Sequence, residues 1–474
     1  MHDRCELIRD VEDAPGGPHV GAFFDLDRTL LAGFSVTSFF LDALMAGRIG
    51  PAAVAGAMLA GLRFRAGQLG FSGLLAEAAT LLRGQPEEDM VRIGERIFEQ
   101  RLAADVYPEA IALVHAHRRA EHTLAIVSSA TRYQIEPLAR ELGIPHVLCT
   151  GLEVRDGRFT GEIVRPTCYG PGKLRAAQRL AAERGVRLEE SFFYTDSEED
   201  LPLLVGVGRP RPTNPSRTLA GIARDRGWPQ RSFASRGLPS ATDVLRTALG
   251  LGSLVPSLLL GVPAAILDGR WRTAVNVATA TWGELGTALA GIGLRTTGEE
   301  HLWSHRPAVF VFNHQSGIEP LLLCKLLHRD FVGVGKMEIK RHPIFGPAFM
   351  LAGVVFIDRA DRVQALAALE PAVDALRSGT SLVIAPEGTR STLGRLGRFK
   401  KGAFRLAMQA GVPIVPIVFR NTLDALPKHA YVARPATVDV VVHPPVQTTG
   451  WTPDTLPEHI AALERLYRAT LDES

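Results

Sequence analysis

The sequence lacks the features that define several protein classes. Its four cysteines include no C-x-x-C pair, which argues against a zinc site and fits free thiols in a reducing compartment; they are Cys5, Cys149, Cys168 and Cys324. The first residues, MHDRCELIRDVEDAPGG, contain no apolar core, so we expect no secretory signal and a chain that starts in the cytosol. The formal net charge is only +3 and gives no electrostatic reason to expect a nucleic-acid partner.

The composition is that of a globular protein with more than one domain. Apolar residues make up 46% and charged residues 22% of the 474 positions, and the mean hydropathy is +0.08. This mixture excludes wholesale disorder and a polytopic membrane bundle. A chain of this length corresponds to roughly two to four domains.

Short apolar runs that alternate with helical stretches predict an α/β architecture in both halves. The first half is expected to hold a mostly parallel sheet with strands at 20–26, 123–127 and 191–195. The segment 34–105 is expected to be an inserted helical subdomain. A stretch rich in Pro, Arg and Gly, 206–240, indicates a domain boundary near residue 240. The second half is expected to hold strands at 308–312, 353–357, 381–385 and 413–419.

One segment near the middle of the chain could contact a membrane. Twenty uncharged residues, 248–267, are long enough to cross a bilayer, but Pro256 and Pro263 would make a poor straight span. A second weakly polar stretch, 273–294, carries Glu284. Together they suggest two short helices that lie on or dip into a membrane face. Buried core helices are the alternative, because apolar runs of this kind are often simply core.

Two carboxylates lie two residues apart after the first expected strand, in Asp25-Leu26-Asp27-Arg28-Thr29. One aspartate can attack phosphorus while the other exchanges a proton with the leaving oxygen. By itself this motif could equally be a helix cap. The groups that an acyl-phosphate mechanism also needs follow along the chain: a hydroxyl and a cation for the phosphoryl oxygens and two carboxylates for Mg²⁺, namely Ser128, Lys173, Asp196 and Asp200.

The order and spacing of these motifs resemble the haloacid dehalogenase superfamily, specifically its phosphoserine-phosphatase-like group with a helical cap, over about residues 20 to 235. The resemblance implies a Rossmann-like domain that hydrolyses phosphomonoesters with Mg²⁺. It further implies a nucleophile, a general acid/base and two phosphate-holding residues, which are in that order Asp25, Asp27, Ser128 and Lys173. The implied metal site consists of Asp25, Asp27, Asp196 and Asp200.

The expected cap contains a strongly apolar stretch, 52–75, in which Arg63 and Arg65 are embedded. Such a surface would suit a phosphomonoester with a lipid tail better than free phosphoserine. Plain helix packing within the cap is the alternative.

A second group of motifs follows the strand expected at 308–312. Asn313-His314-Gln315-Ser316-Gly317-Ile318-Glu319 places an imidazole and a carboxylate five positions apart. A carboxylate that accepts the proton of one ring nitrogen leaves the other nitrogen free to deprotonate a hydroxyl, although an isolated pair of this kind could be a surface cap. Downstream lie Arg359 and the turn Glu387-Gly388-Thr389-Arg390, whose glycine lets backbone amides close on an anion.

A basic segment, LGRLGRFKKGAFR, comes directly after this turn. Its Phe399 and Phe404 interleave with five cations, and a surface of that kind can meet phospholipid headgroups. An ordinary solvated face is the alternative reading of such a run.

Together with VPIVP at 412–416, these motifs resemble the glycerolipid acyltransferases, in particular the 1-acylglycerol-3-phosphate acyltransferases, over about residues 295 to 425. The resemblance implies His314 as the base and an acyl thioester donor, either acyl-CoA or acyl carrier protein. It implies a lysophosphatidate acceptor at a membrane surface and a glycerophosphate site formed by Arg359, Glu387, Gly388, Thr389 and Arg390.

One position departs from the acyltransferase pattern, which has an aspartate where this chain has Glu319. The glutamate keeps the charge but adds a methylene, so a differently placed backbone or a bent rotamer must hold the histidine. From sequence we therefore expect Glu319→Asp to retain or improve acyl transfer and Glu319→Gln to reduce it severely.

The sequence thus predicts a bifunctional, membrane-associated protein on the cytoplasmic face of the cell membrane. It would acylate lysophosphatidate to phosphatidate and hydrolyse a phosphomonoester, with a lipid phosphate as one candidate. Two alternatives stay open: a small-metabolite phosphatase that is merely fused, or one half that serves only as a regulatory or membrane-docking module. The expected parts are a flexible leader, a phosphatase domain, a linker with membrane helices and an acyltransferase domain, at 1–19, 20–240, 241–294 and 295–474.

Overall fold

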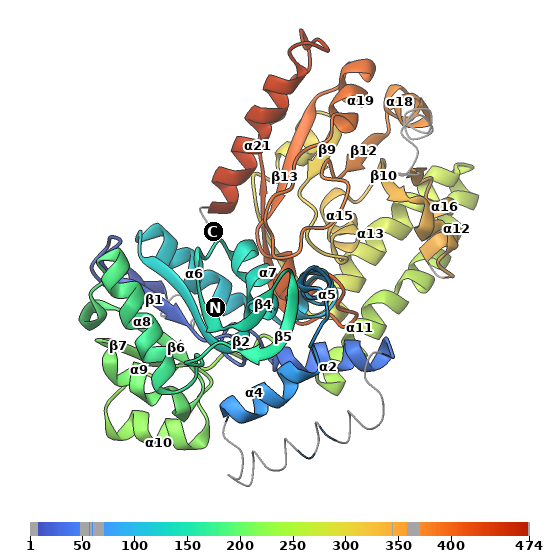
Figure 1. Ribbon diagram of the computed structural model, residues 1–474. Coiled ribbons are helices and arrows are strands. Elements are labelled where there is room, and N and C mark those ends of the chain that lie inside the picture. Colours follow the sequence, from blue (N-terminus) through green and yellow to red (C-terminus); the bar gives the residue numbers. More distant parts are fainter. Residues whose placement is uncertain are drawn as a thin grey trace. The chain divides into compact units, whose positions relative to one another are not determined.

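The computed structural model describes residues 8–47, 56, 59, 71–343, 345–357 and 370–472. The chain divides into two compact units, Met1–Leu238 and Pro239–Ser474 (Figure 1). Each unit holds its own sheet and its own helices, so each is described separately.

The first unit is built on a five-stranded sheet in the order β3-β2-β1-β6-β7, in which every neighbouring pair is parallel. Its central strand, Gly21–Phe24, is buried along its whole length, as expected for a strand covered on both faces. Because parallel strands end at a common edge, the residues that follow β1, β2 and β6 meet there. The strands are β1 Gly21–Phe24, β2 Thr123–Thr131, β3 His146–Thr150, β6 Phe192–Thr195 and β7 Arg209–Pro212.

Helices fill the described parts of the long connection between β1 and β2, as expected for the inserted subdomain. Of residues 48–70 in this connection, the structure describes only 56 and 59. A two-stranded hairpin, β4 Leu152–Arg155 and β5 Arg158–Ile163, was not expected from sequence. The helices of this unit are α2 Ser35–Met45, α4 Phe71–Thr80, α5 Glu87–Gln100, η1 Leu102–Asp105, α6 Pro108–Arg119, α7 Arg132–Leu142, α8 Pro171–Arg184, η2 Leu188–Glu190, η3 Glu198–Asp200, α9 Leu201–Gly206 and α10 Arg217–Asp225.

The N-terminal segment, expected to be a flexible leader, is anchored where the structure describes it. Both carboxylate oxygens of Asp10 accept hydrogen bonds from the guanidinium of Arg211 on β7, at 2.6 and 2.7 Å. Val11 is fully buried. Asp10 of this segment therefore forms an ion pair with the sheet, whereas the composition of the segment had suggested an unattached tail.

Two buried histidines join this segment to the sheet. His122 Nε2 lies 2.8 Å from the carbonyl oxygen of Pro15, His122 Nδ1 lies 2.7 Å from His117 Nδ1, and His117 Nε2 lies 2.9 Å from Tyr194 Oη. A carbonyl can only accept, so His122 Nε2 carries a proton. In the neutral pair His117 Nδ1 then donates to His122, and Tyr194 donates to His117. A proton added to His122 would place two N–H groups face to face, and one added to His117 Nε2 would force Tyr194 to reverse its hydrogen bond.

We predict that the first unit loses stability as the pH falls below about 6.5, the unperturbed histidine pKa. Burial, with His122 and Arg211, lowers the pKa of His117 well below its usual value, so the unfolded chain binds a proton that the folded chain refuses. The loss is up to about 1.4 kcal/mol per pH unit from this group. Hydrogen-exchange protection of α6 and β2 at about pH 7.5 and 5.5 measures it.

The His117→Gln variant should lose this pH dependence relative to the unsubstituted protein, while His305→Gln, at an exposed position, should keep it. Equal slopes in all three proteins would contradict a role for the buried pair.

The second unit has a seven-stranded sheet in the order β11-β10-β12-β9-β13-β14-β8. All pairs are parallel except β13 with β14. Separate hydrophobic clusters cover the two faces of the sheet. The strands are β8 Ile292–Thr297, β9 Val309–Phe312, β10 Phe331–Lys336, β11 Val355–Ile357, β12 Ser381–Ile384, β13 Ile414–Phe419 and β14 Ala436–Val442.

The helices of this unit are α11 Ala241–Gly252, α12 Leu254–Asp268, α13 Trp271–Ala290, α14 His301–Ser304, α15 Glu319–Leu327, η4 Met337–Arg341, α16 Phe345–Leu351, α18 Glu370–Arg377, α19 Gly402–Ala410, α20 Thr422–Ala425 and α21 Leu456–Asp472. The structure confirms the predicted α/β class for both units.

The two apolar stretches expected to be membrane helices behave differently. α13 buries one face, including Ala278, Trp282 and Gly286, and it packs closely on α15. α12 instead exposes large apolar side chains such as Ile266 and Leu267. Within the described residues, Ala241–Asp268 is the one helical stretch long and apolar enough to cross a membrane. The first stretch therefore keeps its membrane interpretation, and the second contributes to the core.

Candidate functional sites

The first site lies at the carboxyl edge of the five-stranded sheet. Lys173, the third residue of α8, places its Nζ 2.6 Å from Asp25 Oδ1 and 2.7 Å from Asp200 Oδ2. All three side chains are buried. Asp25 follows β1 directly, Lys173 lies in the first turn of α8, and Asp200 ends η3. The sheet edge and two helical segments thus bring together residues that are far apart in sequence.

Asp27 and Ser128 lie at the same edge. The backbone N–H of Ser35, the first residue of α2, donates to Asp27 Oδ1 at 2.7 Å and so fixes this carboxylate. Burial raises the pKa of Asp27, and Ser35 and Lys173 oppose the rise. Ser128 is buried in β2, two positions beyond Ile126, which is the register partner of Phe24.

Asp196 follows β6 and pairs with a residue that sequence reasoning did not assign. The guanidinium of Arg28 lies 3.1 Å from Asp196 Oδ2, and its side chain is partly exposed. Thr195 donates its hydroxyl proton to Asp200 Oδ2 at 2.5 Å. Arg28 directly follows Asp27 in the sequence, and Thr195 directly precedes Asp196. This adjacency to the motif aspartates is the sequence feature that could have identified both residues.

Negative charge dominates this site. Burial raises the pKa of Asp25 to about 8, with Asp200 and Asp196 adding to the effect and Lys173 opposing it. Burial also raises the pKa of Asp196 to about 6, against the influence of Arg28. For Lys173, the two carboxylates outweigh the cost of burial and raise the pKa of the ammonium group. The site therefore holds a charged lysine among carboxylates that repel one another.

The second site lies where β9 ends. His314 Nδ1 is 2.5 Å from Glu319 Oε2, and Glu319, the first residue of α15, is completely buried. Glu319 Oε1 accepts hydrogen bonds from the backbone N–H groups of Gln315 and Ser316, at 2.8 and 2.7 Å, and from the hydroxyl of Thr422 at 3.0 Å. Four donors thus hold one carboxylate, which leaves His314 Nε2 as the ring nitrogen available to a substrate.

Hydrogen bonds join the turn after β12 to the histidine loop, residues 313–318, which connects β9 to α15. Glu387 accepts hydrogen bonds from the backbone N–H groups of His314 and Gly397, at 2.7 and 2.6 Å, and the N–H of Ser391 donates to the carbonyl of His314 at 2.8 Å. Both oxygens of Glu387 are therefore engaged by the backbone, and its negative charge would repel phosphate. The contacts favour a positioning part for Glu387 over the direct phosphate contact expected from sequence.

One cation borders the histidine loop and a second borders the turn after β12. A Cβ built on Gly317 would lie 3.3 Å from Arg390 Nη1, and one built on Gly388 would lie 2.7 Å from Lys400 Nζ. Gly388 has a φ of +74°, which favours glycine for a second reason. Thr389, which lies between Gly388 and Arg390 in the sequence, is exposed. Arg359 lies outside the described residues.

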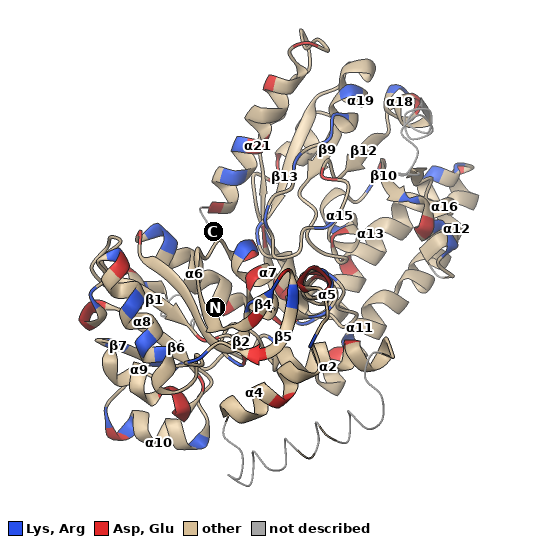
Figure 2. Ribbon diagram, viewed as in Figure 1, with Lys and Arg blue, Asp and Glu red and all other residues tan. Residues whose placement is uncertain are grey.

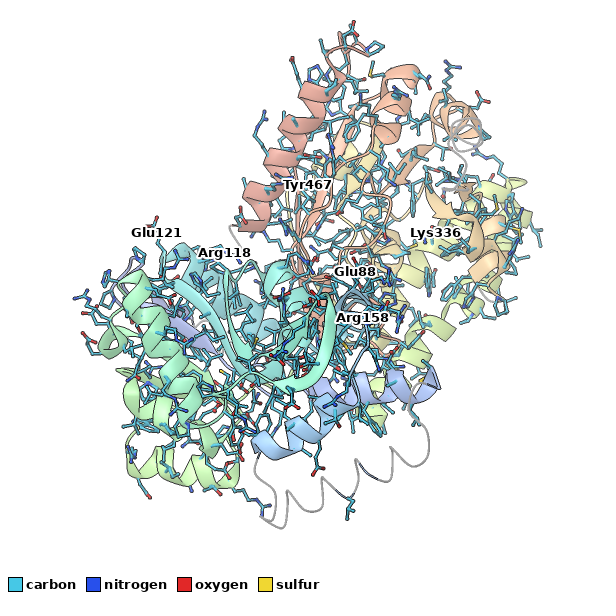
Figure 3. All side chains as sticks on the ribbon, viewed as in Figure 1. Glu88, Arg118, Glu121, Arg158, Lys336 and Tyr467 are labelled. Carbon is cyan, nitrogen blue, oxygen red and sulfur yellow. The ribbon has the colours of Figure 1, made fainter. Side chains whose placement is uncertain are left out.

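Residues that sequence reasoning passed over hold this site in place. The side chain of Asn313 donates to the carbonyl of Phe419 and accepts from its N–H, both at 2.8 Å, so it joins β9 to β13. Tyr467 on α21 points toward the sheet (Figure 3) and donates to the carbonyl of Val311 at 2.6 Å. Phe399 and Phe404, expected on a lipid-facing surface, are buried in the core.

An apolar cavity of about 190 Å³ opens beside the histidine loop. Gly317 and Ile318 form one wall. Side chains from α11, α13, α15 and α16 and from residues 426–433 form the rest of the lining. A cavity of this kind accepts hydrocarbon rather than charged groups.

Comparison with known proteins separates the same two parts. The haloacid dehalogenase-like hydrolase family matches residues 22–205, and the acyltransferase family matches residues 293–420. A protein of Streptomyces azureus described as an inhibition of morphological differentiation protein is 35% identical over 220 residues, which are 46% of this chain and 79% of that protein.

Two further relatives carry enzyme names. A probable phosphatase of Mycobacterium tuberculosis is 32% identical over 256 residues, which are 51% of this chain and 88% of that protein. A 1-acyl-sn-glycerol-3-phosphate acyltransferase of Limnanthes alba is 34% identical over 187 residues, which are 39% of this chain and 66% of that protein. The chain therefore belongs to the haloacid dehalogenase-like hydrolases, and it fuses a hydrolase domain of that family to an acyltransferase domain.

Proposed function

We propose that the first unit hydrolyses a phosphomonoester through an aspartyl-phosphate on Asp25. The contact of Lys173 with both Asp25 and Asp200 carries this proposal, because a buried cation beside a carboxylate can hold the incoming phosphoryl oxygens. An oxygen of Asp25 bonds to phosphorus as the ester P–O bond breaks, and Asp27 gives its proton to the leaving alcohol. Asp27 then takes a proton from the water that releases phosphate. Ser128 and Lys173 hold the phosphate.

Mg²⁺ is the cofactor that we assign to this reaction, held by Asp25, Asp27, Asp196 and Asp200. When bound, it supplies positive charge that screens the phosphoryl oxygens from the carboxylate of Asp25. The residues fit, because carboxylate oxygens are the ligands that Mg²⁺ prefers. Burial and the charges of Asp200 and Asp196 raise the pKa of Asp25, and a cation held among these carboxylates would relieve that cost. No three metal-ligating side chains already converge within the described part of the chain. Lys173 is paired with Asp25 and Asp200, and Arg28 is paired with Asp196.

Arg28 should compete with Mg²⁺ for Asp196. We expect Arg28→Gln to tighten Mg²⁺ binding about two- to fivefold, the range of a partly exposed ion pair. Isothermal titration with Mg²⁺ in the absence of substrate measures this directly. The matched control is Arg187→Gln, which removes a similarly exposed ion pair with Glu190 elsewhere in the unit. Weaker Mg²⁺ binding by Arg28→Gln would mean that Arg28 supports the metal site instead.

The second unit acylates a lysophospholipid, with His314 as the general base. The 2.5 Å contact with Glu319 carries this assignment, because it fixes the proton on Nδ1 and leaves Nε2 free to deprotonate the acceptor hydroxyl. The hydroxyl oxygen then attacks the thioester carbonyl of acyl-CoA or acyl carrier protein, and the thiol leaves. Arg390 and Lys400 supply positive charge for the phosphate of lysophosphatidate. The cavity beside Gly317 suits an acyl chain.

The geometry of Glu319 changes the expectation for its variants. We expect Glu319→Gln to lower kcat of acyl transfer at least about hundredfold, because an amide cannot stabilise the protonated imidazole. Glu319→Asp should also lose most activity, since its carboxylate would retreat from both His314 and the amides of Gln315 and Ser316. Steady-state kinetics with lysophosphatidate measures both. Full activity of Glu319→Gln would remove the carboxylate from the mechanism.

The acyltransferase half sits at a membrane, on its cytoplasmic face. The exposed apolar residues of α12 support this assignment, because water disfavours so many uncovered hydrocarbon side chains on one helix. A membrane would also supply a lysophospholipid acceptor.

The two reactions could act in sequence, first forming phosphatidate and then diacylglycerol. Radiolabelled lysophosphatidate with acyl-CoA and Mg²⁺ tests this on the full chain. We expect both labelled products from the unsubstituted protein, phosphatidate alone from Asp25→Asn, and neither from His314→Ala. Accumulation of phosphatidate without diacylglycerol in the unsubstituted protein would contradict a lipid substrate for the phosphatase. Hydrolysis of phosphoserine in that same preparation would then identify a small-metabolite phosphatase.

A further inference from the structure

The side chain of Gln134 connects two parts of the phosphatase unit that are far apart in sequence. Its Oε1 accepts hydrogen bonds from the backbone N–H and the hydroxyl of Thr131, at 2.9 and 3.0 Å. Its Nε2 donates to Ser35 Oγ at 3.1 Å. Ser35 is completely buried, and Gln134 is only 9% exposed. Both ends of the Gln134 amide are therefore bonded inside the protein.

The orientation of this amide follows from its partners. A backbone N–H can only donate, so the atom that faces the N–H of Thr131 is the oxygen of the amide. The amide nitrogen then faces Ser35, whose hydroxyl oxygen accepts the hydrogen bond. An aliphatic side chain at position 134 would make neither contact.

The two ends of this connection reach two groups of the phosphatase site. Ser35 is the first residue of α2, and its backbone N–H donates to Asp27 Oδ1 at 2.7 Å. The bond from Gln134 therefore fixes the residue that fixes the proposed general acid/base. At the other end, Thr131 closes β2 three residues after Ser128. Gln134 thus connects Asp27 to the strand that carries the proposed phosphate-holding hydroxyl.

A neighbouring contact provides an internal comparison. Tyr133, one position before Gln134, donates its hydroxyl proton to Glu87 Oε1 at 2.8 Å. Glu87 begins α5, whose first turn is acidic (Figure 2). This contact also joins α7 to a helix of the inserted subdomain. Within the described residues, however, neither of these two side chains bonds to Asp27.

We propose that Gln134 is a positioning residue of the phosphatase site, which acts through Ser35 to hold Asp27 where it gives its proton to the leaving alcohol. The inference rests on the phosphatase function proposed above and adds a residue that the sequence motifs do not include. As the ester P–O bond breaks, the proton passes from the carboxyl group of Asp27 to the departing oxygen. Gln134 takes no part in the transfer itself.

The leaving group of the substrate tests this role on the full chain with Mg²⁺. The phenolate of p-nitrophenyl phosphate leaves without a proton, whereas the alkoxides of phosphatidate and phosphoserine need one. For Gln134→Met we expect kcat/KM for the alkyl ester that the protein hydrolyses to fall at least about tenfold more than kcat/KM for p-nitrophenyl phosphate. Ser35→Ala keeps the backbone N–H but loses the contact with Gln134, so it should have the same effect.

A double variant and a matched control separate positioning from general support. Ser35→Ala combined with Gln134→Met should differ by less than about twofold from either single variant, because both changes remove the same contact. Tyr133→Phe breaks the neighbouring contact and should leave the ratio between the two kinds of ester unchanged. Thermal midpoints show which variants are folded. If Gln134→Met does not fold, Ser35→Ala provides the same comparison.

Three results would overturn the proposal, and they differ in what else they overturn. Equal losses on the two kinds of ester would leave Gln134 with a structural role only. Losses that multiply in the double variant would show that Gln134 does not act through Ser35. If the unsubstituted protein hydrolyses none of the three esters, the proposed phosphatase function fails and the part of Gln134 fails with it.

Discussion

Neighbouring parallel strands end at the same edge of a sheet, and both reaction centres form at such an edge. In the first unit β1 and β6 deliver Asp25 and Asp196 to a shared edge, and in the second unit β9 and β12 deliver His314 and Glu387. Each edge gathers groups that the chain separates by tens of residues or more. The remaining elements of each unit, the helices on the two faces above all, keep those strands buried and in register.

The two centres differ in how their buried carboxylates are balanced. In the hydrolase domain, buried carboxylates outnumber the cations, so the site favours an added positive charge and resists ionisation of Asp25. In the acyltransferase domain, one buried carboxylate is saturated by four donors and fixes the orientation of the His314 ring. The first site therefore gathers negative charge, whereas the second holds one carboxylate within a closed set of hydrogen bonds.

The sequence predicted those features that are local. Apolar runs located β1, β2, β6, β9, β12 and β13, and spaced motifs selected the residues that meet at the two edges. It missed β7, because RPRP has no apolar run. It also missed the ion pair of Asp10 with Arg211, because these two residues meet only in the folded unit. The pairing of Arg28 with Asp196 and the backbone contacts of Glu387 also depend on three-dimensional position, which spacing does not encode.

The helix α21 extends the acyltransferase domain beyond its recognisable motifs. The family match ends at residue 420, yet Tyr467 supports the strand that carries His314, and Glu464 accepts a hydrogen bond from the N–H of Phe399 at 2.7 Å. A recombinant fragment cut at the limit of sequence similarity would lose β14 and this brace together. A fragment that keeps β14 and this helix must therefore run to the end of α21, about fifty residues beyond the limit of the family match.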